Sequence, residues 1–269
     1  MEARVAQRPV VVKIGGSTLG SHDTTLQDLV TLQKDGVNLV IVHGGGEIIS
    51  QWMKRQGTRP KFVRGLRVTD TESLEIVVAV LAGLVNKHLV SSLISMGGET
   101  VGFSGVDGAM LQAKIANPDL GFVGEITKVN PCPLIQAIEA GYIPLVAPVG
   151  IHYDDGSPQA GKMLNINGDT VAGELANVME ANRLIFLTDV EGVLDSGGHL
   201  IPKLTSRHAQ FLLNSGVAKG GMIPKLEACV RALDTVPTAE IVDGRRPGAL
   251  LECIANNGRG TRIQKTGTA

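Results

Sequence analysis

The chain has few aromatic residues, few cysteines and almost no net charge. Phe, Trp and Tyr together make up 3% of its 269 residues. Its 25 basic residues are balanced by 26 acidic ones, so no broad positive field favours nucleic-acid binding. Its three cysteines stand far apart without Cys-x-x-Cys or Cys/His ligand spacing, which argues against a structural zinc site and favours a reducing compartment.

Long apolar segments are also lacking. No uninterrupted apolar run reaches the roughly 18 residues that a membrane span needs, and the run 76–85 comes closest. Residues 1–9 are polar, without the apolar centre of a signal peptide. We therefore expect a cytoplasmic protein that has neither a membrane nor a nucleic acid as its partner.

The chain does contain a regular alternation of short apolar runs and amphipathic segments. The β-branched run 10–14 stops at two glycines, residues 26–32 repeat with helical spacing, and the run 37–42 precedes His43 and three glycines. Strands that are apolar on both faces are typical of a mostly parallel sheet in an α/β fold. The same patterns predict strands over 99–103, 142–149, 184–187 and 239–242, and helices over 48–53, 71–96, 134–140, 170–179, 206–214, 223–233 and 249–255.

Two boundaries follow from local signals. Thr69 and Glu72 have the spacing of a capping box at the start of the longest helix. The loop-rich stretch 153–168 is the predicted seam between two lobes. We place an N-terminal lobe at 1–168 and a C-terminal lobe at 169–269.

Two glycine clusters follow predicted strands, at Gly15-Gly16 and at 44–46. Ligands of an open parallel sheet bind at the carboxyl ends of its strands. Glycine there lets backbone N–H groups approach an anion, and the next helix adds the positive end of its dipole. Only Ile14 separates Lys13 from the first cluster, so its ammonium group is a candidate partner for phosphate oxygens. The alternatives are tight turns and a lysine that reaches solvent.

Other familiar motifs are incomplete or missing. The stretch 156–163 matches the Gly-x4-Gly-Lys pattern of a P-loop, but Met163 stands where Ser or Thr is required and no buried strand precedes it. The Gly-x-Gly-x-x-Gly fingerprint of dinucleotide binding does not occur. The six histidines include no His-x3-His pair, so imidazole ligation of a metal has no support, and we interpret His43 as a satisfied polar residue at a strand end.

Six motifs occur in order along nearly the whole chain, and together they resemble the amino-acid kinase family. Their segments are 12–17 (VKIGGS), 42–46 (VHGGG), 64–70 (RGLRVTD), 164–169 (LNINGD), 187–193 (LTDVEGV) and 220–225 (GGMIPK). Within that family, RGLRVTD followed by NINGD is most similar to the acetylglutamate kinases.

The resemblance implies a fold and a reaction. The fold is a three-layer α/β/α sandwich around a mainly parallel sheet, similar to carbamate kinase. The N-terminal lobe is expected to hold the acyl amino acid and form a homodimer, and the C-terminal lobe to hold ATP with its Mg²⁺. The implied reaction moves the γ-phosphoryl group of ATP to the γ-carboxylate of N-acetyl-L-glutamate, in arginine biosynthesis.

The resemblance also implies residue roles. Lys13 and Lys225 match the lysines that neutralise the moving phosphoryl group, and Asp169 matches the aspartate that holds them. Arg67 matches the clamp on the substrate α-carboxylate, and Asn165 binds the acetylamino-acid backbone. Gly45 and Gly46 face the substrate, and Gly15 and Gly45 are implied donors to the γ-phosphate, with no protein ligand to the metal. The remaining implied nucleotide contacts are Gly15, Gly16, Gly44, Asp189, Val190, Glu191, Gly192, Val193, Leu194, Val217, Ala218 and Lys219.

Elementary physics fits these roles, although plainer interpretations stay open. A carboxylate acceptor needs no general base, so the barrier is repulsion between two anions, which cations and oriented N–H groups lower. Alternatively, Asp169 caps a helix, Lys225 is solvated, Arg67 forms a surface ion pair and Asn165 is a turn residue.

Rival functions also stay open. The rivals are an aminoadipate-type kinase of lysine biosynthesis, a nucleotide monophosphate kinase of the same fold, and an amino-acid sensor without turnover. Only about nine residues precede the first strand, which resembles the dimeric, arginine-insensitive kind of acetylglutamate kinase. For the dimer we expect a self-complementary apolar face of Val77, Val80, Leu81 and Leu84.

Overall fold

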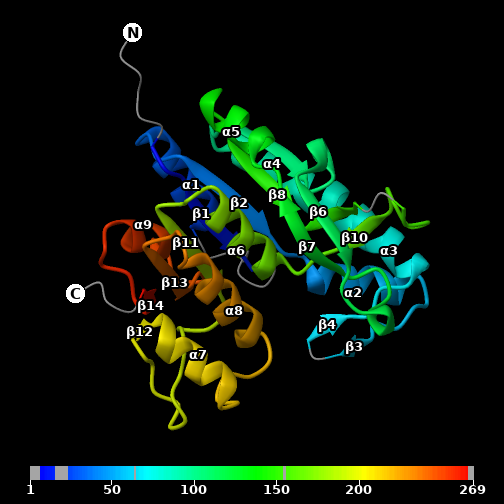
Figure 1. The fold of residues 1–269 in the computed structure, drawn as a ribbon. Coiled ribbons are helices and arrows are strands. Elements are labelled where there is room, and N and C mark those ends of the chain that lie inside the picture. The colour runs from blue at the N-terminus through cyan, green and yellow to red at the C-terminus, as the bar shows by residue number, and fades with distance from the viewer. Residues whose placement is uncertain (1–6, 16–23, 64, 154–155, 266–269) are drawn as a thin grey trace.

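The structure is a computed structural model that describes residues 7–15, 24–63, 65–153 and 156–265. An eight-stranded sheet runs through its centre in the order β12-β14-β13-β11-β1-β2-β8-β5 (Figure 1). β12 and β14 run opposite to the other six strands, which are parallel to one another. The bounds are β1 (Val10–Ile14), β2 (Leu39–His43), β5 (Thr100–Ser104), β8 (Ile143–Ala147), β11 (Arg183–Thr188), β12 (Lys203–Thr205), β13 (Thr238–Asp243) and β14 (Gly260–Gln264).

Helices cover both faces of this sheet, and each face has its own apolar core. One layer contains α5 (Cys132–Glu139), α6 (Gly168–Val178) and α8 (Met222–Ala232), with α7 (Ser206–Asn214) packed on α8. The other contains α1 (Thr25–Lys34), α4 (Asn86–Ser95) and α9 (Ala249–Ile254). Val11 and Val12 of β1 are fully buried in opposite cores, as expected for a strand that is apolar on both faces. The predicted three-layer α/β/α fold is therefore confirmed.

A second, four-stranded sheet and a short hairpin were not predicted from the sequence. The sheet has the order β10-β9-β6-β7, and β3 pairs with β4 beside helix α2 (Gly46–Arg55) (Figure 1). Their strands are short and mix polar with apolar positions, so no two-residue period stands out. The bounds are β3 (Phe62–Val63), β4 (Leu66–Arg67), β6 (Leu111–Ile115), β7 (Gly124–Val129), β9 (Val149–His152) and β10 (Met163–Asn165), with short 3₁₀ helices at Asp107–Ala109 and Pro118–Leu120.

The long predicted helix is present but interrupted. It consists of α3 (Thr71–Val78), a π-helical segment (Ala79–Val85) and α4. The Asp70 side chain caps it by accepting from the Ser73 N–H at 2.9 Å, so the predicted Thr69–Glu72 capping box was wrong. The stretch Thr71–Ser95 is long and apolar enough to cross a membrane by length and composition alone, yet Leu89 and Leu93 are buried in the second core, as in a core helix.

The predicted dimer face on this helix is mostly internal. Val77, Val80 and Leu81 are buried within the monomer, and only Leu84, with 47% of its surface exposed, is available to a partner. Helical spacing alone does not distinguish a core face from an interface, which explains the error.

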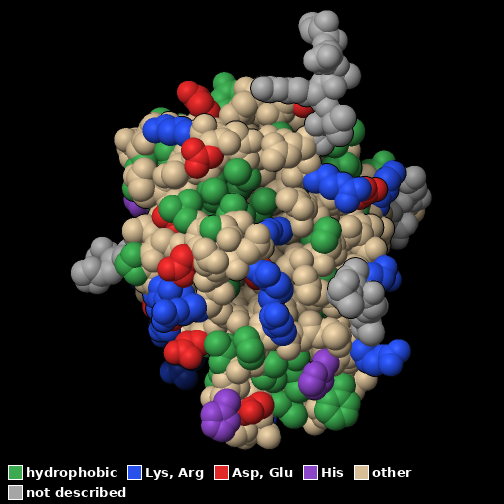
Figure 2. All heavy atoms as spheres, turned by 90° about the vertical axis from the view of Figure 1, so that its left-hand side faces the viewer, with side chains coloured by type: hydrophobic (Ala, Val, Ile, Leu, Met, Phe, Trp, Pro, Cys, Tyr) green, Lys and Arg blue, Asp and Glu red, His purple; other side chains and the backbone are tan. Residues whose placement is uncertain are grey.

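Two further expectations concern loops and surface charge. The P-loop-like stretch 156–162 leads into strand β10 rather than into a helix, so the P-loop context is absent there. Figure 2, which faces the α9 side of the molecule, shows Lys and Arg side chains interspersed with Asp and Glu. Among the described residues, ion pairs such as Arg246–Glu252, at 2.8 Å, also bring opposite charges together.

Candidate functional site

Three charged side chains from three elements meet beside the carboxyl end of β1. Asp169, in the first turn of α6, lies between Lys13 of β1 and Lys225 of α8. Lys13 Nζ is 2.7 Å from Asp169 Oδ1, and Lys225 Nζ donates to Asp169 Oδ2 at 3.1 Å. The three side chains are only 10%, 13% and 7% exposed for Lys13, Lys225 and Asp169, respectively. The trio that the sequence predicted is therefore brought together.

The charge of Asp169 is set by two opposing effects. Burial alone would raise the pKa of its carboxyl, but attraction to Lys13 and Lys225 outweighs burial and holds the pKa below its usual value. The helix-cap interpretation of Asp169 was wrong. Asn167 is the cap of α6, because its side chain accepts from the N–H groups of Asp169 and Thr170. The Asp169 carboxylate is thus directed to the lysines.

The glycine turn after β2 forms the start of α2. Gly45 is the N-cap and Gly46 the first helical residue, and N–H groups of a first helical turn have no intrahelical acceptor. A Cβ on Gly45 would lie 2.7 Å from Leu81 Cδ2, so a larger residue there would force the Leu81 side chain to shift. The Gly15 N–H instead donates to Leu187 O and the Gly44 N–H to Ile14 O, both at 3.0 Å. The Gly15 N–H is therefore occupied by a hydrogen bond to the neighbouring strand, which contradicts its implied role as a donor to the γ-phosphate. Gly16 lies outside the described residues.

Arg67 is buried without a carboxylate partner among the described residues. Its Nη2 donates to Gly46 O and Ser50 Oγ, each at 2.8 Å, and its guanidinium lies 4.7 Å from the Phe62 ring centroid. Burial lowers the pKa of Arg67 from its usual value, but guanidinium groups stay charged in proteins. A buried cation without a counter-ion favours an anionic ligand. The surface-ion-pair interpretation of Arg67 was wrong.

Asn165, at the end of β10, is oriented by a chain of hydrogen bonds from β4. Its Nδ2 donates to Thr69 Oγ1 at 3.0 Å, and that hydroxyl donates to Arg67 O at 2.9 Å. Thr69 thereby couples the two predicted substrate contacts, a role that nothing in the sequence signalled.

One pocket of about 190 Å³ collects all four predicted substrate contacts, Gly45, Gly46, Arg67 and Asn165. Gly168 also lines it, and a Cβ there would lie 3.5 Å from Lys13 Cε, so the pocket adjoins the lysine–aspartate trio. The pocket therefore contains the Arg67 guanidinium, and the Lys13 side chain lies beside one of its lining residues. Its apolar lining includes Ile49, Phe62, Leu66, Leu81, Val123 and Ile166.

Comparison with known proteins places this site in a family. The model of the amino acid kinase family matches residues 8–243. An acetylglutamate kinase of Dehalococcoides mccartyi is 41% identical over 94% of this chain and 93% of its own length. That of Methanothrix thermoacetophila is 44% identical over 94% of this chain and 91% of its own. This chain belongs to the amino acid kinase family.

A solved structure agrees with that assignment. N-acetylglutamate synthase from Neisseria gonorrhoeae, complexed with coenzyme A and N-acetyl-glutamate, superposes with a TM-score of 0.82 at 28% identity. The match covers 97% of this chain and 60% of the synthase. The amino acid kinase fold thus accounts for nearly the whole molecule.

The predicted nucleotide contacts of this amino acid kinase lie mostly in a pocket of about 220 Å³ in the C-terminal part. It joins the loop after β11 to the segment between α7 and α8. Asp189 and Glu191 belong to the same loop but are exposed and do not line the pocket. The predicted residues that do line it are Val190, Gly192, Val193, Leu194, Val217, Ala218 and Lys219.

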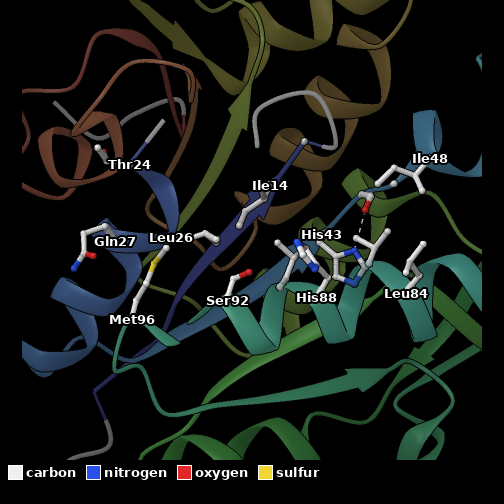
Figure 3. Close-up of a pocket in the computed structure, with 15 residues that line it drawn as sticks. Ile14, Thr24, Leu26, Gln27, His43, Ile48, Leu84, His88, Ser92 and Met96 are labelled. Carbon is white, nitrogen blue, oxygen red and sulfur yellow. Dashed lines mark hydrogen bonds between the residues drawn. The ribbon is translucent and has the colours of Figure 1, made fainter. Parts of the chain in front are cut away.

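A larger cavity, of about 610 Å³, lies beside the Gly44–Gly45 turn between α1 and α4 (Figure 3). Its lining is mainly apolar and includes Leu26, Ile48 and Leu89, but none of the lysine–aspartate trio. The pocket of about 190 Å³ therefore suits an anion better, because it contains Arg67 and adjoins Lys13. His43 lines the larger cavity; its ring is buried and hydrogen-bonded, which confirms the interpretation of a satisfied polar residue.

Proposed function

We propose that this amino acid kinase transfers the γ-phosphoryl group of ATP to the γ-carboxylate of N-acetyl-L-glutamate, as in arginine biosynthesis. The observation that carries the proposal is the buried guanidinium of Arg67 in a pocket that adjoins Lys13. A diacid acceptor suits this arrangement, because one carboxylate can pair with Arg67 while the other meets the lysines. The acetylglutamate kinase relatives support the same acceptor.

The chemical step requires charge neutralisation more than proton transfer. A γ-carboxylate oxygen forms a bond to the γ-phosphorus while the bond from that phosphorus to the β–γ bridging oxygen breaks, and ADP leaves. The nucleophile is already ionised, so no general base is needed. Lys13 and Lys225 offset the repulsion between acceptor and phosphates, and the N–H groups of Gly45 and Gly46 add oriented donors.

Magnesium is expected to arrive with the nucleotide. Among the described residues, no group of three or more His, Cys, Asp or Glu side chains could hold a metal ion. The carboxylate of Asp169, in the trio beside the substrate pocket, is already paired with two lysines. When bound to the phosphate oxygens, Mg²⁺ would supply further charge neutralisation. We assign no protein ligand to it.

An acceptor panel tests the proposed activity. With MgATP, the purified protein should turn over N-acetyl-L-glutamate and give an acyl phosphate that hydroxylamine traps as a hydroxamate. The same preparation carrying Lys225→Met controls for contaminating kinases. N-acetylated aminoadipate and UMP represent the rival kinases, and faster turnover of either one would replace the proposed acceptor.

Replacing Arg67 should affect one substrate selectively. Arg67→Ala removes the carboxylate clamp and should raise the KM for N-acetyl-L-glutamate about 100-fold, since truncating one partner of a buried charge pair costs roughly 2–5 kcal/mol. The KM for ATP should change less than about threefold, because the predicted nucleotide pocket does not include Arg67. Steady-state kinetics measure both constants, with Arg67→Lys as the charge-conserving control. Equal increases in both constants would contradict the clamp.

We also propose a division of labour between lobes. Four strands of the central sheet, β1, β2, β5 and β8, precede residue 168, and four, β11 to β14, follow it. The substrate pocket is lined by residues up to Gly168, and the nucleotide pocket by residues from Val190 onward. This distribution supports an acyl-amino-acid lobe at 1–168 and an ATP lobe at 169–269. A protein of this kind would work in the cytoplasm, where both substrates occur.

A homodimer is proposed through α4 and the sheet edge beside it. β5 ends the central sheet, and Ile94 on the neighbouring α4 is 53% exposed. Open edges and exposed apolar residues are surfaces that a second copy covers. Sedimentation should therefore show a dimer that Ile94→Glu converts to monomer. Ile135→Glu, at a position of α5 that is 41% exposed, is the matched control and should leave the dimer intact.

A further inference from the structure

His43 makes two hydrogen-bond contacts that define its protonation state. Its Nε2 lies 3.2 Å from the Asn86 side-chain nitrogen, and its Nδ1 lies 2.9 Å from Gly44 O. An amide NH₂ group only donates and a carbonyl oxygen only accepts. The Gly44 carbonyl therefore requires the proton on Nδ1, and Nε2 is left as an acceptor for the Asn86 amide, whose two hydrogens face three acceptors in all. Both contacts are satisfied by the neutral Nδ1–H tautomer alone.

The orientation of Asn86 is itself fixed by its surroundings. Its NH₂ group also faces two carbonyl acceptors, Leu145 O at 3.0 Å and Phe103 O at 3.3 Å, while its Oδ1 accepts from Lys87 Nζ at 3.0 Å. Reversing the amide would place an oxygen against two carbonyl oxygens. A Cβ on Gly102 would lie 2.1 Å from Asn86 Oδ1, so the site of this side chain depends on a glycine of β5.

The backbone around Asn86 is unusual as well. Asn86 is the first residue after the π-helical segment Ala79–Val85 in an otherwise α-helical stretch. Such π-helical insertions are uncommon and occur often at functional sites. Here the insertion directly precedes the fully buried amide that faces His43.

The electrostatic environment favours the same neutral ring. Burial is the largest effect and lowers the pKa of His43 to about 4. The Gly44 hydrogen bond opposes it as the second largest effect on this pKa, and the positive charges of Lys13 and Lys87 add to the lowering. At neutral pH the ring therefore adds no charge to the site. Its role must be that of an oriented hydrogen-bond donor.

That donor acts on a peptide group of the glycine turn. The carbonyl of Gly44 and the N–H of Gly45 belong to one planar trans peptide, in which they point in opposite directions. When His43 holds the carbonyl, the Gly45 N–H is directed away from His43. His43 lines the larger cavity but not the smaller pocket, whereas Gly45 lines both (Figure 3, dashed line). The N–H is thereby held on the side away from His43, and Gly45 is one of the residues that line the pocket containing Arg67.

We propose that His43, held in the Nδ1–H tautomer by Asn86, is a positioning residue that orients the Gly44–Gly45 peptide for phosphoryl transfer. This inference rests on the proposed function. The hydrogen bond to Gly44 O also polarises the peptide, which makes its N–H a better donor to developing negative charge. A histidine that served packing alone would need hydrogen-bond partners for its ring nitrogens, but either nitrogen could carry the proton.

The tautomer can be measured without any substrate. In ¹⁵N-labelled protein at pH 7, the His43 ring, identified by its loss in His43→Gln, should show a protonated Nδ1 and an unprotonated Nε2. This is the less common tautomer of free histidine. An Nε2–H ring or an imidazolium at pH 7 would overturn the proposal, whatever the enzyme phosphorylates.

Two substitutions separate positioning from packing. Asn places its amide nitrogen near the Nδ1 position and keeps a donor for Gly44 O, whereas Gln places its amide near the Nε2 position and keeps only the contact with Asn86. His43→Gln should lower kcat about tenfold with less than a threefold change in either KM, and His43→Asn should recover most of that turnover. Thermal melting should show that the rescue does not follow stability.

The outcomes distinguish this inference from the proposed function. Equal kcat losses in the two variants, or losses that follow their melting temperatures, would overturn the positioning role and leave the kinase assignment intact. Absence of turnover by the wild-type protein with every acceptor would overturn the kinase assignment, and the ring tautomer would still show whether His43 carries its proton on Nδ1.

Discussion

Replacing Lys225 by methionine should lower kcat by about 10²–10³ with N-acetyl-L-glutamate and MgATP, the range found when one preorganised donor to a developing charge is removed. Methionine keeps an unbranched chain of similar length, and Lys225 sits in α8 with its ammonium group on Asp169. After the substitution Asp169 still pairs with Lys13 at 2.7 Å, so we expect the fold to persist. Steady-state kinetics and circular dichroism measure the two effects.

A matched lysine controls for loss of charge alone. Lys114 is 58% exposed, and its ammonium group lies 3.4 Å from the exposed Glu125 carboxylate. Such a surface ion pair contributes little to the free energy of unfolding. Lys114→Met should therefore leave kcat within about twofold of the wild type, because surface pairs contribute little. If Lys225→Met also kept kcat within twofold, phosphoryl neutralisation by Lys225 would be refuted.

The central sheet could be predicted from the sequence for a simple reason. The run 184–187 is apolar at every position and the run 10–14 at every position except Lys13, and this pattern is typical of strands covered on both faces. The small second sheet lacks this signal, because β7 alternates exposed with half-buried residues over a short length. Its strands are stabilised by tertiary pairing rather than by local preference.

The candidate site, like the fold, could be predicted only in part from the sequence. The family motifs identified Lys13, Asp169 and Arg67. In the structure Lys13 pairs with Asp169, and Arg67 lines the pocket that adjoins this pair. The supporting partners were beyond reach of the sequence. Asn86 lies 43 residues from His43, and its partners include carbonyl groups of two strands, so no local pattern signals the contact. Phe62 was missed because its two-residue strand carries no period.

Asp169→Asn should have the second large effect, on stability as well as on turnover. The amide keeps the shape of the carboxylate but removes its charge, which leaves two nearly buried ammonium groups without a counter-ion. Breaking a buried ion pair by neutralising one partner costs about 3–5 kcal/mol of unfolding free energy. Turnover should fall at least about 100-fold, because both lysines lose the group that orients them. Urea unfolding and steady-state kinetics measure the two losses.

The loss of unfolding free energy in Asp169→Asn should depend on pH in a defined direction. Because the pKa of Asp169 is held below its usual value, the charged carboxylate stabilises the fold fully above the unfolded-state pKa of about 3.9, and this contribution disappears as pH falls through the lower folded-state pKa. The difference in unfolding free energy between wild type and Asp169→Asn should therefore be largest near pH 7 and narrow in acid. Asp234→Asn, at an exposed position after α8, is the control and should show no such difference. A gap that stayed constant down to pH 3 would show that Asp169 does not act through its charge.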